Sequence, residues 1–213
     1  MNKTSTRFIV EALTRAIVEH RLAPGEKLVE QRLADQFGVS RTLVRQALFQ
    51  LSQKHLIVME PARGAKVASP SVAEAKQVFA VRRMLESGMV SAFIGLATPA
   101  DIETLKMHTI QEKAAVDSND IANRTELLGD FHVCMAQLMG NTVLAQLLFD
   151  LTSRCTLAAL MYQTTAAAQH SYEEHSAILQ AIASRNELLA LQLMDDHLCN
   201  VEKALALPAS TAP

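Results

Sequence analysis

Apolar residues recur at helical spacing along most of this 213-residue chain. In the first third, spacings of three and four residues predict three helices, over residues 7–20, 29–37 and 41–51. A small β-hairpin is predicted next, with strands at residues 56–59 and 65–67 joined by turn residues at 61–64. From residue 72 to residue 205 the pattern stays helical, without a convincing strand.

Turn residues divide this second stretch into six or seven helices. The expected ranges are 72–95 (as one helix or a broken pair), 99–116, 121–139, 142–168, 171–183 and 187–205. The chain is therefore predicted to be mainly α, with an N-terminal domain of three helices and a hairpin followed by an all-α bundle. The expected boundaries are residues 1–70, residues 71–206 and a disordered tail at 207–213.

One predicted helix has the character of a DNA-recognition helix. Ser40 is a good N-cap, and apolar residues from Leu43 to Leu51 form one face. Arg41, Thr42 and Arg45 fall on the other face at the N-terminal end, where arginine can contact guanine or phosphate. The alternative is a surface helix with solvated arginines. The preceding helix and the short turn from Phe37 to Ser40 favour a helix-turn-helix unit.

Charge separates the two halves of the chain. The net charge of the whole chain is only −2. Residues 1–70 contain 11 Lys and Arg against 6 Asp and Glu, whereas residues 71–213 contain 9 against 16. A basic domain joined to an acidic one is typical of a DNA-binding head with a separate sensing or assembly body.

The N-terminal domain resembles the winged helix-turn-helix of the GntR regulators. The resemblance rests on Leu22-x-Pro24-Gly25-x-x-Leu28, on the run from Leu33 to Leu48 that includes Gly38-Val39-Ser40-Arg41-Thr42, and on Arg63-Gly64. It implies that DNA is contacted by Gln31, Ser40, Arg41, Thr42, Arg45, Arg63 and Gly64. This chain departs from the family at Leu43, where proline is usual, and at Gln31, where arginine is frequent.

The helical half resembles the FCD effector domain of the FadR-type branch of that family. The residues that carry this looser match are Val81-Arg82-x-x-Leu85-Glu86, Phe131-His132, Gly140-Asn141, Glu174-His175-x-x-Ile178 and His197. The resemblance implies a divalent metal that helps to hold a small organic acid, and it implies that Arg82 grips the acid. The alternative for Arg82 is a surface ion pair with Glu86, one helical turn away.

Three histidines form the predicted metal site. His175 and His197 are equally distant from Asn186, the centre of a predicted helical hairpin, so they lie at the same height in the bundle. His132 lies in the middle of another helix, and three imidazoles suit zinc, nickel or manganese. The aspartate that the family has one turn before the first histidine is Leu128 here. The alternative is three hydrogen-bonded core histidines beside an effector that is held without metal.

These features predict a ligand-responsive transcriptional repressor. We expect a homodimer on a palindromic operator, released by a small carboxylate effector. The alternatives are a regulator with a metal-free or vestigial pocket and, less favoured, a metal-dependent enzyme. Because the sequence shows neither a signal-peptide core nor an uninterrupted apolar span, we expect a cytoplasmic protein without a membrane partner. The three scattered cysteines are expected to be free thiols.

Overall fold

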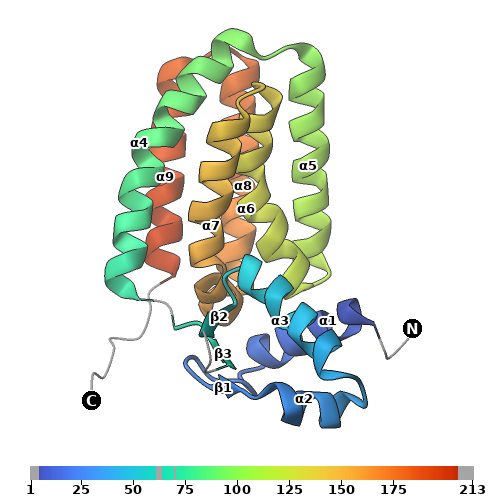
Figure 1. Cartoon of the computed structure of the whole chain (residues 1–213). Helices are drawn as coiled ribbons and strands as arrows, with labels where there is room; N and C mark the ends of the chain where they lie inside the picture. The colour runs from blue at the N-terminus through green and yellow to red at the C-terminus, as the bar shows by residue number, and fades with distance from the viewer. Residues whose placement is uncertain (1–4, 61–63, 70, 206–213) are drawn as a thin grey trace. The chain divides into compact units, whose positions relative to one another are not determined.

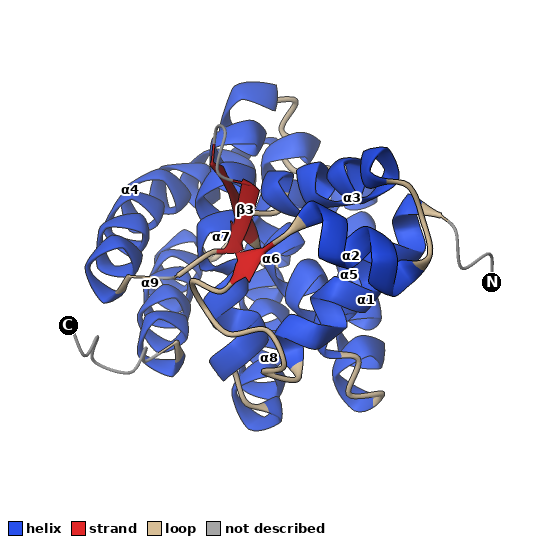
Figure 2. Ribbon diagram, turned by 60° about the horizontal axis from the view of Figure 1, so that its bottom comes forward, coloured by secondary structure: helices blue, strands red, loops and turns tan. Residues whose placement is uncertain are grey.

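The computed structural model describes residues 5–60, 64–69 and 71–205, which form two compact units. Unit 1 lies within residues 1–70 and unit 2 within residues 71–213. Figure 1 shows the whole chain, and Figure 2 shows that the described strands lie together in one small sheet. The Arg63 side chain, which the sequence places at the hairpin tip, lies outside the described residues.

Unit 1 contains three helices and a three-stranded sheet within its described part. The helices are α1 (Thr6–Val18), α2 (Glu30–Phe37) and α3 (Arg41–Gln53). The strands are β1 (Lys27–Leu28), β2 (Ile57–Glu60) and β3 (Gly64–Val67), in the antiparallel order β1-β3-β2. The short segment before α2 thus contributes a third strand beside the predicted hairpin.

Local chemistry defines the turn between α2 and α3. Gly38 ends α2 in the left-handed region, at φ 65°, where a Cβ would be strained. The Ser40 side chain accepts a hydrogen bond from the Leu43 backbone N–H and so begins α3. Val44, Leu48 and other apolar residues of α3 are fully buried, so the opposite face of the helix is the one left to solvent.

Unit 2 is a bundle of long helices. They are α4 (Val72–Leu96), α5 (Pro99–Asp117), α6 (Ile121–Leu138), α7 (Thr142–Tyr162), α8 (Thr165–Ala183) and α9 (Glu187–Ala204). Helix α4 lies along α9, α6 lies along α7, and α8 packs against α5 and α9 (Figure 1). Phe79, Phe93 and Phe131 are buried in the shared apolar core.

The break between α7 and α8 lies earlier than the sequence pattern predicted. A single helix was expected over 142–168, but α7 ends at Tyr162 and the backbone of Gln163 is extended. The Thr164 side chain accepts a hydrogen bond from the Ala167 N–H and begins α8. The apolar periodicity continues through this point, so it hid a break that depends on a single capping hydroxyl.

Helix α7 is, among the described residues, the one helix long and apolar enough to cross a membrane, although the sequence pattern suggested none. By itself this is weak evidence for a membrane. Leu148 of α7 is fully buried in the bundle core. Arg154 forms an ion pair with Glu74 of α4 at 2.8 Å. These are the contacts of a helix that packs within the bundle.

Candidate nucleic-acid interface and candidate metal centre

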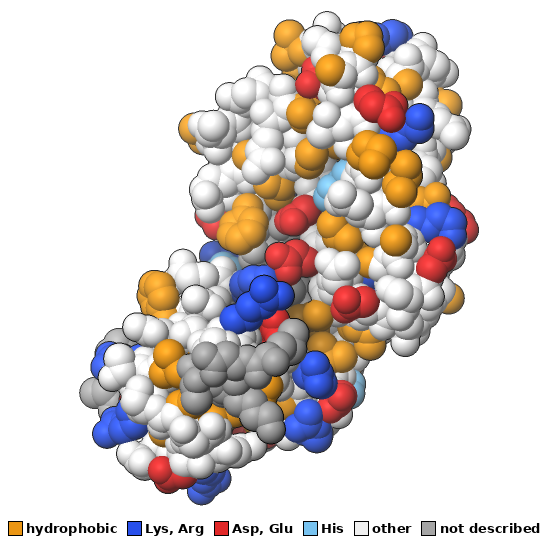
Figure 3. All heavy atoms as spheres, turned by 90° about the vertical axis from the view of Figure 1, so that its right-hand side faces the viewer, with side chains coloured by type: hydrophobic (Ala, Val, Ile, Leu, Met, Phe, Trp, Pro, Cys, Tyr) orange, Lys and Arg blue, Asp and Glu red, His pale blue; other side chains and the backbone are white. Residues whose placement is uncertain are grey.

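The exposed start of α3 is the candidate nucleic-acid interface. Arg41 and Arg45 are one helical turn apart, and 64% and 72% of their side-chain surface is accessible. Thr42 between them is also exposed. Figure 3 shows Lys and Arg side chains spread over the surface of unit 1, in keeping with its basic composition. Such a helix face can contact base edges and phosphates.

A single carboxylate from α2 lies beside both arginines. Oε2 of Glu30 is 3.3 Å from a terminal nitrogen of Arg41, and Oε1 is 3.8 Å from Nε of Arg45. Sequence analysis missed Glu30, because it lies 11 residues before Arg41 and no local pattern joins the two. Since exposed ion pairs of this kind are worth little, DNA phosphates can replace the carboxylate.

The remaining predicted DNA contacts have different surroundings. The Gln31 amide is exposed and donates a hydrogen bond to Asp35, one turn along α2. The Ser40 hydroxyl is used as the N-cap of α3. Gly64 begins β3 at φ 92°, a conformation that favours glycine, and a Cβ there would lie 3.6 Å from the Leu28 carbonyl oxygen. Thr42, Arg41 and Arg45 therefore have the side chains most open to a ligand.

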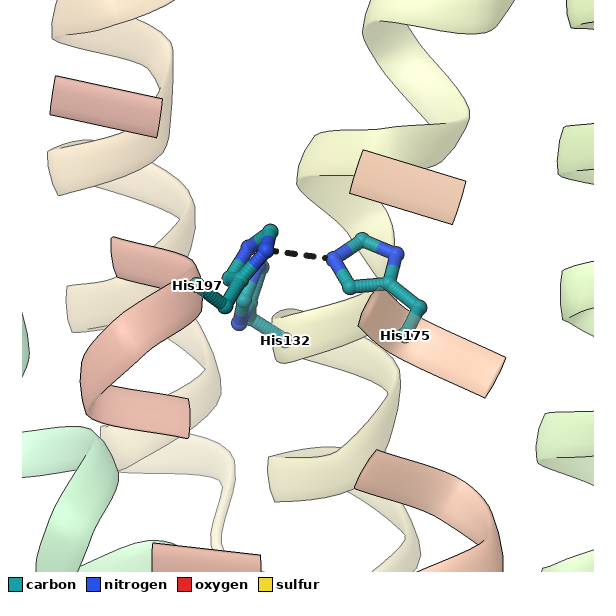
Figure 4. Close-up of side chains that lie close together, drawn as sticks. All are labelled: His132, His175 and His197. Carbon is teal, nitrogen blue, oxygen red and sulfur yellow. Dashed lines mark hydrogen bonds between the residues drawn. The ribbon is translucent and has the colours of Figure 1, made fainter. Parts of the chain in front are cut away.

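The structure brings the three predicted histidines together inside unit 2. His132 of α6, His175 of α8 and His197 of α9 are buried, and one ring nitrogen of each lies within 4.8 Å of the others. Figure 4 shows the rings converging from their separate helices. Nε2 of His175 is 3.2 Å from Nε2 of His197. Two nitrogens that bind one tetrahedral zinc ion at 2.0–2.1 Å are about 3.3 Å apart.

Each imidazole also faces a glutamate through its other nitrogen. Nδ1 of His175 is 3.0 Å from both carboxylate oxygens of Glu112, and Nδ1 of His197 is 2.8 Å from Glu174. Nδ1 of His132 lies 2.5 Å from Glu86. A proton on Nδ1 of His175 and of His197 satisfies Glu112 and Glu174 and leaves the Nε2 lone pair of each ring directed inward. The contact of His132 with Glu86 is close but lacks hydrogen-bond geometry, and both atoms are otherwise without a hydrogen-bond partner among the described residues. Lone pairs that converge without a donor are unfavourable, so a cation fits this centre.

Burial keeps two of these rings neutral. It lowers the pKa of His132 to about 4, against the attraction of Glu86, and it lowers the pKa of His197 to about 3, with the neighbouring His175 adding to the effect. Burial opposes the ionisation of Glu86, but Arg82 and His132 outweigh it and lower the pKa of that carboxyl to about 2. Neutral imidazoles are the form that binds metal.

Arg82 is buried, so its contact with Glu86 is not the surface ion pair that the sequence left open as the alternative. Its side chain is 5% accessible, and its Nε donates a hydrogen bond to the fully buried Glu86 at 2.7 Å. The guanidinium also lies over the Phe79 ring, 5.3 Å from its centroid. Arg82 is thus joined to the histidine cluster through Glu86.

Leu128 lies in a small apolar cluster of its own with Val116 and Ala168, packed against Tyr172. The position at which the family carries an aspartate is therefore filled by hydrocarbon. One turn earlier on α6, Arg124 is buried and binds Asn119, Thr165 and the Gln163 carbonyl. Sequence analysis missed Arg124, whose partners lie in the turn just before α6 and at the distant junction of α7 and α8.

Comparison with family models gives two matches that together span most of the chain. Residues 5–67 match the model of the bacterial regulatory proteins of the gntR family, and residues 77–200 match the FCD domain.

Three characterised sequences illustrate the similarity. The transcriptional regulator LutR of Bacillus subtilis is 29% identical over 208 residues, covering 87% of this chain and 94% of that protein. The Uxu operon regulator of Haemophilus influenzae is 30% identical over 224 residues, covering 96% and 83%. The transcriptional repressor RspR of Escherichia coli is 24% identical over 202 residues, covering 92% and 87%.

Solved structures show the same fold. Escherichia coli McbR/YncC superposes with a TM-score of 0.71 at 20% identity, covering 94% of this chain and 96% of that one. A GntR regulator from Rhodococcus sp. RHA1 gives a TM-score of 0.72 at 22% identity, covering 95% and 99%.

The low pKa values predict that acid destabilises the metal-free protein. Below pH 6.5 the unfolded chain protonates His132 and His197, whereas the folded protein keeps them neutral down to about pH 4 and 3. The unfolded state then binds more protons than the folded state. The free energy of unfolding should therefore decrease as the pH is lowered, by up to about 1.4 kcal/mol per pH unit for each histidine. Glu86 adds to the loss below pH 4.5.

Urea unfolding with a chelator present, at pH 7.5 and pH 5.5, measures this effect. A free energy of unfolding of unit 2 that is equal at both pH values would contradict the buried neutral state of the two rings.

Proposed function

This chain belongs to the GntR family of bacterial transcriptional regulators and carries an FCD domain, and from this we propose that it is a ligand-responsive repressor. The repressor would bind a palindromic operator as a homodimer and leave it when a small organic acid binds in unit 2. Support comes from the combination, in one chain, of an exposed arginine-bearing helix and a buried histidine centre. RspR, a relative of similar length, is named as a repressor.

DNA binding is a property of the family, and the proposal concerns which residues perform it. Arg41, Thr42 and Arg45 would contact the major groove, with Gln31, Ser40 and Gly64 close to the DNA backbone. Arg63 is proposed on sequence grounds alone. Because unit 1 is basic, phosphate contacts should dominate affinity and make it depend steeply on salt.

Homodimer formation is proposed for unit 2. A single winged helix contacts few base pairs, and two-fold pairing doubles the contacts and fixes the spacing of half-sites. Large apolar side chains are exposed on unit 2, among them Met84 of α4 at 76%, Val143 of α7 at 71% and Leu188 of α9 at 81%. Exposed apolar surface of this kind is consistent with a protein interface.

The effector is proposed to be a small carboxylate held beside a divalent metal, with zinc or nickel preferred by an all-imidazole set and manganese less so. His132, His175 and His197 would be the protein ligands, and the metal would supply a Lewis-acidic position for the effector. Glu86 occupies Nε of Arg82, so only the terminal nitrogens of that arginine would reach the acid. The alternative is a metal-free or vestigial pocket.

The family and its relatives are transcriptional regulators, so the chain is not an enzyme. The relatives are bacterial, and we infer that this regulator works in the cytoplasm, where its DNA is found.

Removal of either recognition arginine should weaken operator binding. We expect Arg41→Ala and Arg45→Ala each to cost about 1–3 kcal/mol, since both side chains are free to reach base edges. Fluorescence anisotropy on duplexes that the wild-type protein selects from a random pool measures this. Arg7→Ala is the control, because it removes a still more exposed charge, 84% accessible, from α1 and should change affinity little. Wild-type affinity in both α3 variants would show that another surface recognises DNA.

Unit 2 should be the part that dimerises. Residues 71–213 have their own core, so we expect this fragment and the full chain to be dimers by light scattering. Residues 1–70 should be monomeric and bind the operator poorly. A monomeric 71–213 fragment would rule out this mode of assembly.

The metal proposal is tested by melting curves recorded with chelator and with zinc. Each of His132→Ala, His175→Ala and His197→Ala should abolish the rise in melting temperature that zinc gives the wild type. Leu128→Asp should destabilise the chelated protein by a few kcal/mol, because it buries a carboxylate in an apolar cluster. Zinc should then rescue it, since the carboxylate lies one turn from His132. If zinc raises neither melting temperature, the pocket is metal-free.

A further inference from the structure

Each predicted metal ligand in unit 2 has its own carboxylate behind it, and the arrangement is repeated three times. In every case the glutamate also meets a second donor four residues earlier on its own helix. The three chains of contacts are Arg82–Glu86–His132, His108–Glu112–His175 and His170–Glu174–His197. His108 and His170, which the spacing of the metal histidines left unexplained, thus belong to the same arrangement.

The glutamates come from helices other than those of the rings they face. Glu86 of α4 faces a ring of α6, and Glu112 of α5 faces a ring of α8. Glu174 of α8 faces His197 of α9, and it also accepts a hydrogen bond from the Asn200 amide at 2.6 Å. Five helices therefore fix the orientation of three imidazoles.

Packing holds the middle ring from the side as well. The Phe131 ring stacks on His175, with centroids 4.1 Å apart and planes 10° from parallel. The stacking fixes the plane of the His175 ring, and a flip that turned Nε2 away would lose the contacts of Nδ1 with Glu112. Nε2 of His175 therefore points to the centre of the histidine cluster before a metal binds. This preorganisation favours tight binding of a metal by only three protein ligands.

The buried negative charge around the histidines also favours a cation at their centre. Glu86 and Glu112 are fully buried and Glu174 is 13% accessible, so three carboxylates surround the three ligand positions. Arg82 is the permanent cation among their partners. Buried charges are costly unless they are compensated, and a divalent cation at the centre compensates the excess. With Leu128 in place of an aspartate ligand, the negative charge near a bound metal would come from these carboxylates behind the histidines.

We propose that Glu86, Glu112 and Glu174 are positioning residues of the metal centre. Each holds its histidine as the Nδ1–H tautomer and supplies negative charge, so that three neutral imidazoles bind a divalent cation and the fourth position stays open to an exogenous ligand. This inference rests on the proposed metal site, and it assigns part of the affinity for the metal to residues that do not touch it.

Glu174 provides the sharpest test, because its neighbour Glu173 is a matched control. Glu174→Gln keeps an oxygen acceptor for Nδ1 but removes the charge, and the partial exposure of the site favours folding. Glu173 is exposed and accepts a hydrogen bond from Gln169, away from the histidines. Full-length Glu174→Gln should bind zinc about 10–100-fold more weakly in chelator competition, with Glu173→Gln unchanged. The cobalt absorption spectrum should shift in the first variant alone.

The possible outcomes distinguish a failure of this inference from a failure of the proposed metal site. If Glu174→Gln lowers the melting temperature of the chelated protein but leaves zinc affinity and the cobalt spectrum unaltered, Glu174 is merely structural and the inference fails. If the wild type binds no zinc, the metal site itself fails and this inference fails with it. The ¹⁵N NMR spectrum of the zinc-loaded wild type is independent of folding in any variant. It should show three rings protonated at Nδ1, and coordination through Nδ1 would overturn the proposal.

Discussion

Unit 2 depends on a single constraint, which is that carboxylates buried in a helical bundle must be paired. Apolar contacts are non-directional and allow helices to slide, whereas a carboxylate facing an imidazole fixes both position and orientation. The Glu86–His132 contact joins α4 to α6, Glu112–His175 joins α5 to α8, and Glu174–His197 joins α8 to α9. The same contacts that set helix register therefore also aim the ligand nitrogens. Stability and ligand recognition cannot be separated at these positions.

In unit 1, by contrast, the functional charges must remain accessible to a partner. Arg41 and Arg45 are exposed, and both lie beside Glu30, whose side chain is 17% accessible. A weak, solvent-screened pair costs little to exchange for phosphate. The buried side of the same helix is anchored by fully buried residues such as Val44 and Leu48. A helix anchored on its buried side thus presents exposed cations, which suits a surface that first finds DNA by charge and then contacts bases.

Local signals explain what could be predicted from the sequence. Gly38, Ser40 and an apolar face identify the recognition helix in the sequence. The closeness of His175 and His197 follows from their equal spacing from Asn186, because a helix rises by a fixed distance per residue. The two residues of the Glu174–His197 contact are 23 positions apart in the sequence, and those of the Glu112–His175 contact are 63 positions apart. No periodicity encodes such pairs, since they depend on which helices become neighbours. The break at Gln163 was missed for a related reason, as one hydroxyl overrode a continuous apolar pattern.

The apolar environment of Leu128 bears on how such a regulator would switch. An effector changes the population of two arrangements only if it binds them with different affinity. With a coordinating aspartate, the metal charge would be partly cancelled before any ligand arrived. With Leu128 packed against Val116 and Ala168, no carboxylate from position 128 would occupy a coordination position, so a bound metal would keep that position for an anionic effector. An incoming carboxylate would then alter the charge balance that holds α4, α5, α6, α8 and α9 in register. Typical allosteric coupling is about 1–3 kcal/mol, so an effector would need to change that balance by a comparable amount.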